Sequence, residues 1–149
     1  MPARPAYLRP RLIALVMAGG AVGTLLRHGV AQLVAPVGGV PVATVVVNVA
    51  GAFALAWLLT ALAGRGQESR TRRDLRLLAG TGLLGAFTTY SALAVDLDVL
   101  NLRGHPVLAL GYGALTLLGG LAAAHLGVLA AGARRSPHTC MGPDDGRRR

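Results

Sequence analysis

The segment GLLGAFTTYSAL, residues 82–93, lies within an apolar stretch and combines two glycines with four consecutive hydroxyl-bearing residues. The hydroxyls belong to Thr88, Thr89, Tyr90 and Ser91. Successive residues of a helix sweep around its axis, so these four side chains cannot all face lipid. Hydrocarbon offers no hydrogen-bond partners, and unpaired backbone survives there only where protein buries it or where it lines a cavity. The segment therefore predicts a membrane helix that is broken at a permeation or binding site.

The rest of the chain has the composition of a membrane protein. Of its 149 residues, 53% are hydrophobic and 14% are charged, and the mean hydropathy is +0.54. Four apolar stretches each approach or exceed the roughly 20 residues that cross about 30 Å of hydrocarbon, at about residues 12–34, 42–63, 75–100 and 106–133. We therefore expect an all-α integral membrane four-helix bundle with a broken third helix, in one membrane domain over residues 12–133.

The arginines predict the orientation of this bundle. All 15 basic residues are arginines, and an even number of spans returns the chain to the side on which it starts. All but two arginines then fall on the side of the termini; the exceptions are Arg103 on the other side and Arg27 inside a span. The positive-inside rule places both the N-terminal segment 1–11 and the C-terminal tail 134–149 in the cytoplasm. The tail is basic and expected to be disordered, and its charge predicts no nucleic-acid partner.

Two polar side chains inside the spans each have two interpretations. Arg27 follows a glycine-rich stretch, and a guanidinium inside the membrane costs about 2.5 kcal/mol or more. It either snorkels to the interface beside a packing face made by the glycines, or forms an electropositive vestibule or a loop anchor. Asn48 lies in a β-branched apolar run. Its amide either bonds to another helix or donates to a dehydrated anion.

The hydroxyls of the third and fourth spans are similarly ambiguous, because each either donates to an anion or bonds back to its own helix. Tyr112 and Thr116 share a helical face, although Tyr112 also suits an interfacial aromatic. Asp96 and Asp98, toward the outer end of the third span, are expected to face water. Where the third helix breaks, its freed carbonyls suit a hard cation such as Na⁺.

Three segments in this order resemble the CrcB/Fluc fluoride channels, and the resemblance covers essentially all four spans. They are the glycine-rich segment ending in Arg27, the VNVAGAF segment around Asn48, and GLLGAFTTYSAL. The resemblance implies an antiparallel, dual-topology dimer with two pores at its interface, which passively exports fluoride across the plasma membrane and lowers cytoplasmic fluoride. It also implies a structural Na⁺ at the dimer interface, held by backbone carbonyls at the positions of Gly85 and Thr88.

The resemblance further implies a fluoride path with closely spaced donors. In the family, two phenylalanines of the third span present ring edges, which carry partial positive charge. The matching positions are Tyr90, which keeps an edge and adds a hydroxyl, and Leu93, which has no ring. The path implied on this chain comprises Asn48, Tyr90, Ser91, Leu93, Tyr112 and Thr116.

The arginine distribution predicts the kind of dimer. A homodimer of opposite orientations needs a subunit with little arginine bias, whereas this subunit is strongly one-sided. We therefore expect it to pair with an oppositely oriented paralogue, which supplies the aromatic edges that Leu93 lacks.

Two other classes of membrane protein remain as alternatives. A small proton-coupled multidrug exporter needs a carboxylate inside a span, and the first three spans contain no Glu. A non-transporting assembly subunit explains the glycines and Asn48, but not the clustered hydroxyls. The chain has no phosphate-binding loop, catalytic triad or metal-ligand spacing, so we expect no enzymatic activity.

Overall fold

The computed structural model describes residues 9–63 and 69–133, which are helical over most of their length. The elements in chain order are α1 (Pro10–Leu33), α2 (Val42–Ala63), α3 (Arg70–Leu75), the π-helix η2 (Arg76–Leu84), α4 (Gly85–Phe87), α5 (Tyr90–Leu102) and α6 (Pro106–Ala133). α3, η2, α4 and α5 follow one another along one span. Within residues 9–63 and 69–133, four stretches are long and apolar enough to cross a membrane. The predicted all-α, four-span architecture is confirmed. The predicted tail 134–149 and most of the N-terminal segment 1–11 lie outside the described residues.

The third span begins at Arg70, earlier than the expected start at residue 75. Ser69 caps its first turn, because the Ser69 hydroxyl accepts a hydrogen bond of 3.3 Å from the backbone N–H of Arg72. The added residues are mostly charged, so a hydropathy pattern does not detect them as part of a membrane helix.

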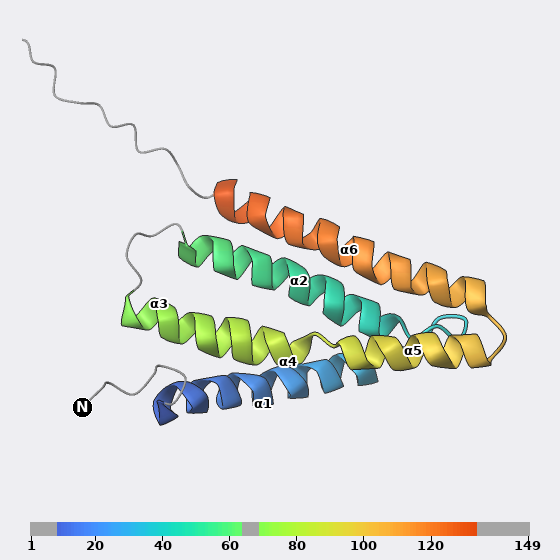
Figure 1. Cartoon of the computed structure of the whole chain (residues 1–149), viewed down its shortest axis with the longest axis horizontal. Coiled ribbons are helices and arrows are strands. Elements are labelled where there is room, and N and C mark those ends of the chain that lie inside the picture. The colour runs from blue at the N-terminus through green and yellow to red at the C-terminus, as the bar shows by residue number, and fades with distance from the viewer. Residues whose placement is uncertain (1–8, 64–68, 134–149) are drawn as a thin grey trace, which may run out of the picture.

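The helices pack mainly as two pairs, as Figure 1 shows. α2 lies along α6, while α1 lies along η2 and α4, and α5 packs against α6. Successive spans run in opposite directions, so the starts of α1 and α3 lie at the same end as the ends of α2 and α6. We call this end, which carries Arg9, Arg11 and the arginines of residues 70–76, the basic end. Arg103 follows α5 at the opposite end.

Glycines allow α1 and η2 to approach each other backbone to backbone. A Cβ atom added at Gly19 would overlap the carbonyl oxygen of Leu78, and one added at Gly23 would overlap the carbonyl oxygen of Leu83. Main-chain atoms cannot rotate aside as a flexible side chain can. The glycine-rich stretch before Arg27 is therefore a packing face, as one of its two interpretations requires.

The turn between α1 and α2 also needs glycine. Gly38 and Gly39 have φ values of +57° and +81°, which side chains with a Cβ rarely adopt. The flanking residues Val37 and Val40 exchange two backbone hydrogen bonds of 3.0 Å, as in a tight hairpin. After this turn α2 begins at Val42, and the preceding Pro41 carbonyl lies within hydrogen-bonding distance of Tyr112 on α6.

Candidate functional site

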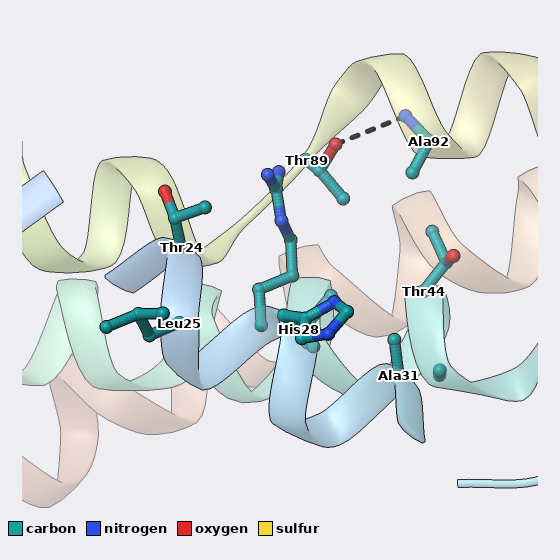
Figure 2. A pocket seen from close by; sticks show the side chains of 10 residues that line it. Thr24, Leu25, His28, Ala31, Thr44, Thr89 and Ala92 are labelled. Carbon is teal, nitrogen blue, oxygen red and sulfur yellow. Dashed lines mark hydrogen bonds between the residues drawn. The ribbon is translucent and has the colours of Figure 1, made fainter. Parts of the chain in front are cut away.

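The third span loses its helical geometry at Thr88 and Thr89. Both residues are extended, with φ −74° and ψ 155° at Thr88 and φ −150° and ψ 121° at Thr89. These two residues form the link between α4 and α5, which Figure 1 draws as a thin line without helical turns. The helix resumes at Tyr90, where the Thr89 hydroxyl caps it by accepting from the backbone N–H of Ala92 at 3.1 Å (Figure 2). This interruption lies inside residues 82–93, where the sequence predicts a break.

The amide of Asn48, on α2, bonds to both backbone groups of Thr89. Its Nδ2 donates to the Thr89 carbonyl at 3.0 Å, and its Oδ1 accepts from the Thr89 N–H at 2.8 Å. The side chain thus replaces the helical partners that the interruption removes. Asn48 thus bonds to another span, as in its first interpretation, but at the non-helical link of that span rather than at a helix. The amide nitrogen carries a second hydrogen, which this contact does not use. Donation of that hydrogen to an anion stays a prediction.

The Asn48 contact also explains how the Gly85 carbonyl becomes available. In an uninterrupted helix the Thr89 N–H would donate to the carbonyl of Gly85, four residues earlier; here it donates to Asn48. The extended backbone of Thr88 takes its carbonyl out of the helical direction as well. Gly85 is exposed, and a Cβ atom there would meet, among the described residues, only the Gly80 carbonyl oxygen, at 3.8 Å. Two such backbone oxygens fit a hard cation such as Na⁺.

A cavity of about 390 Å³ adjoins the interruption. Arg27 and His28 line it from α1, Thr44 from α2, and Thr89 from the link; Figure 2 shows His28, Thr44 and Thr89 around the same space. Most of the other lining residues are apolar, so Arg27 brings a permanent positive charge to a largely apolar cavity. This placement agrees with the vestibule interpretation of Arg27, which stays a prediction.

A polar cluster joins α2, α5 and α6 beside this cavity. The Thr44 hydroxyl donates to Asp96 Oδ2 at 2.6 Å, and the Tyr112 hydroxyl lies 3.1 Å from the same oxygen and 2.9 Å from the Pro41 carbonyl. Thr44 and Tyr112 are 8% and 4% exposed. Tyr112 is therefore buried, rather than an aromatic residue at the membrane interface.

The expectation that Asp96 faces water is wrong, whereas Asp98 is exposed. Asp96 is partly buried: the Thr44 hydroxyl donates to its carboxylate, and the Tyr112 hydroxyl shares its one hydrogen between that carboxylate and the Pro41 carbonyl. Helical periodicity could have indicated that Asp96 lies on a buried face. Asp96 follows Leu93 by three residues and precedes Leu100 by four, and both leucines are buried. An acidic residue on a buried face indicates a hydrogen-bonded partner elsewhere in the fold.

The Tyr112 hydroxyl provides a direct test of this cluster. We expect Tyr112→Phe to lower the free energy of unfolding by about 1 kcal/mol, because it removes a buried hydroxyl that the Pro41 carbonyl and the Asp96 carboxylate share. Tyr90→Phe is the matched control: Tyr90 is 81% exposed, and its hydroxyl should contribute little to the stability of the subunit. Thermal unfolding of both variants in detergent measures the difference, and equal melting temperatures would contradict the role given to Tyr112.

Two of the predicted path residues lie on the outside of the subunit. Tyr90 and Ser91 are both exposed, at the first turn of α5. The Ser91 hydroxyl lies 3.2 Å from the Thr89 hydroxyl, so it belongs to the same group of polar atoms as the Asn48 amide. Asn48 and Ser91 thus both contact Thr89 at the interruption.

The other predicted path residues lie inside the bundle. Leu93 is 5% exposed and packs with Leu100, Ala109 and Tyr112. Thr116 is 3% exposed, and its hydroxyl bonds back to the Tyr112 carbonyl at 2.8 Å. The two positions where ring edges are expected thus differ: Tyr90 faces outward and Leu93 faces inward.

Comparison with known proteins places the chain in one group of relatives. The model of the family described as CrcB-like protein, Camphor Resistance (CrcB), matches residues 14–128. The chain is 47% identical over 129 residues to the fluoride-specific ion channel FluC 2 of Leifsonia xyli subsp. xyli, with 87% of this chain and 88% of that protein covered. It is 46% identical over 112 residues to the fluoride-specific ion channel FluC of Deinococcus radiodurans, with 73% and 86% covered. It is also 43% identical over 120 residues to the protein of the same name in Gloeobacter violaceus, with 78% and 93% covered.

Proposed function

We propose, because the chain belongs to the CrcB-like protein family, that it is a subunit of a fluoride-specific ion channel. It lowers cytoplasmic fluoride by passive export across the plasma membrane, with both termini in the cytoplasm. One observation carries the proposal: the cavity lined by Arg27 reaches Thr89, where the third span is interrupted. Family membership favours this function over the multidrug exporter and the assembly subunit, and it favours a channel over an enzyme.

The hydroxyl hydrogens near the interruption divide into two groups. Those of Thr44, Thr88 and Thr116 are donated to Asp96 or to backbone carbonyls. The second group consists of the hydroxyl hydrogens of Thr89 and Ser91. The hydrogen bond between these two hydroxyls uses one of the two hydrogens, so the other hydrogen stays available. Together with the second hydrogen on the Asn48 amide, it offers an anion two donors at the interruption.

These donors suit an anion that must leave water. Fluoride is small and strongly hydrated, so a selective path replaces its water with donors at short range. The positive charge of Arg27 raises the local concentration of anions in the cavity, and the donors beside Thr89 then meet the ion. The exposed ring and hydroxyl of Tyr90 lie where a second subunit would cover them.

We also propose that the functional unit is a dimer with an oppositely oriented paralogue and with one Na⁺ at its interface. The carbonyls of Gly85 and Thr88 would hold the ion, and the exposure of Gly85 supports a site shared with a second subunit. The bound ion would supply positive charge that offsets the dipoles of the freed carbonyls. The one-sided arginines support a paralogue, because they favour a single orientation for this chain.

Fluoride efflux from liposomes tests both proposals. Liposomes loaded with fluoride receive this chain alone, or this chain with the paralogue from the same genome, and a fluoride electrode follows release. We expect rapid efflux from the pair, little from the chain alone, and none of chloride in a parallel chloride-electrode measurement. Full efflux from the chain alone would remove the requirement for a paralogue and leave the channel function intact. No fluoride efflux from the pair would contradict the channel function itself.

A further inference from the structure

Four arginines line a cavity of about 350 Å³ at the basic end, where the start of α1 meets α3. They are Arg9, Arg11, Arg70 and Arg73, and Leu12 lies beside them. The adjacent Asp74 supplies one negative charge: its Oδ2 accepts from Arg11 at 2.6 Å, and its Oδ1 lies 4.0 Å from Arg73. Among the described residues, one carboxylate against four guanidinium groups leaves this cavity with an excess of positive charge.

An apolar groove of about 460 Å³ adjoins the basic cavity, because Leu12 and Arg73 line both. The groove runs between the first turns of α1 and the start of η2. Two of its side chains, Ile13 and Met17, are 45% and 69% exposed, so it opens on the outside of the helix bundle. The other apolar residues that line it are Val16 and Leu77.

Arg73 lies where the two cavities meet, and part of it lacks a partner. Its side chain is 28% exposed, and its Nε is buried without a hydrogen-bond acceptor among the described residues. A buried donor left unpaired costs free energy that an acceptor would recover. Asp74 Oδ1 is likewise buried without a partner in the part of the chain that the structure describes, so the Arg73–Asp74 pair is incompletely hydrogen-bonded.

We propose that the basic cavity and the apolar groove together bind one anionic phospholipid. Its phosphate group lies against the arginines, and one acyl chain lies in the groove along α1. Basic pockets between membrane helices at the cytoplasmic side suit anionic headgroups, whereas the excess positive charge disfavours the cationic amine of a zwitterionic lipid. A free phosphate would satisfy the arginines but would leave the groove unused. The site lies at the opposite end of α1 from Arg27, so it is separate from the fluoride path.

Native mass spectrometry of the purified full-length chain tests this site with phosphatidylglycerol and phosphatidylcholine of identical acyl chains. We expect selective retention of phosphatidylglycerol. Arg9→Gln combined with Arg70→Gln should weaken this retention by about twenty-five-fold, since each basic residue near the membrane surface contributes about a factor of five. The matched control, Arg147→Gln with Arg148→Gln, removes the same charge from the tail and should leave retention unchanged.

A second variant tests the groove without changing any charge. Met17→Trp fills the groove at an exposed position, so the helix should fold normally by circular dichroism while phosphatidylglycerol is retained less. Equal retention of the two lipids, or an equal loss in the tail control, would overturn the proposal. A third outcome would also overturn the proposal: inorganic phosphate displaces the lipid, and Met17→Trp has no effect on lipid retention. The cavity would then bind phosphate alone, without any role for the groove.

Discussion

Replacing Asn48 with aspartate should reduce fluoride efflux by about a hundredfold, because a carboxylate removes a donor and adds a charge where an anion must pass. The Asn48 Nδ2 lies 3.0 Å from the Thr89 carbonyl oxygen. An aspartate oxygen in its place would set two acceptors against each other at that distance. The same negative charge would repel fluoride. The substitution would therefore disturb the backbone geometry at the interruption and make the electrostatic potential along the path less favourable to an anion.

Asn101→Asp provides the matched control for this variant. Asn101 is exposed near the end of α5, and the same change of charge there should leave efflux from the reconstituted pair unaltered. Helicity and size-exclusion behaviour of the Asn48 variant separate loss of the path from loss of the fold. A folded Asn48→Asp variant with normal efflux would exclude Asn48 from the mechanism.

The second large effect is expected at the glycine face of α1. Gly23→Ala should destabilise the chain by about 3 kcal/mol, because its methyl group would overlap the Leu83 carbonyl and force α1 away from η2. α1 supplies Arg27 to the cavity, so the displacement should also lower fluoride efflux. Thermal unfolding and electrode recordings on the same preparation measure both consequences.

Gly29→Ala, in the same helix, is the control for Gly23→Ala. A Cβ atom at Gly29 meets no atom of the described residues within 4 Å, so alanine should be neutral or should stabilise the helix by about 0.5–1 kcal/mol through its better helix propensity. Identical melting temperatures for the two variants would show that α1 does not pack backbone to backbone on η2.

Features that depend on local chemistry were predictable. The four spans follow from apolar length, since bilayer thickness sets how many helical residues are needed. The interruption follows from glycines and hydroxyls in residues 82–93. The start of the third span at Arg70 was missed, because its charged first residues carry no hydropathy signal, and Ser69 acts as a cap through a single hydrogen bond.

The contacts of the candidate site depend instead on distant partners. Asn48 and Thr89 are 41 residues apart in the chain, and Thr44 and Asp96 are 52 residues apart. A side chain's own neighbours in sequence do not tell whether another helix supplies its hydrogen bond. For this reason Asn48 had two open interpretations, and Asp96 was assigned to water.

By itself, the sequence determined the membrane architecture, the interrupted third span and the family, because hydropathy, glycine content and short motifs are properties of contiguous residues. Only the tertiary structure decided that Asn48 bonds to the backbone of Thr89, that the Asp96 carboxylate lies against hydroxyls of α2 and α6, and that four arginines meet an apolar groove. Each of these depends on which faces of separate helices meet. Those faces meet where glycines such as Gly23 let backbones approach and where buried polar groups require partners.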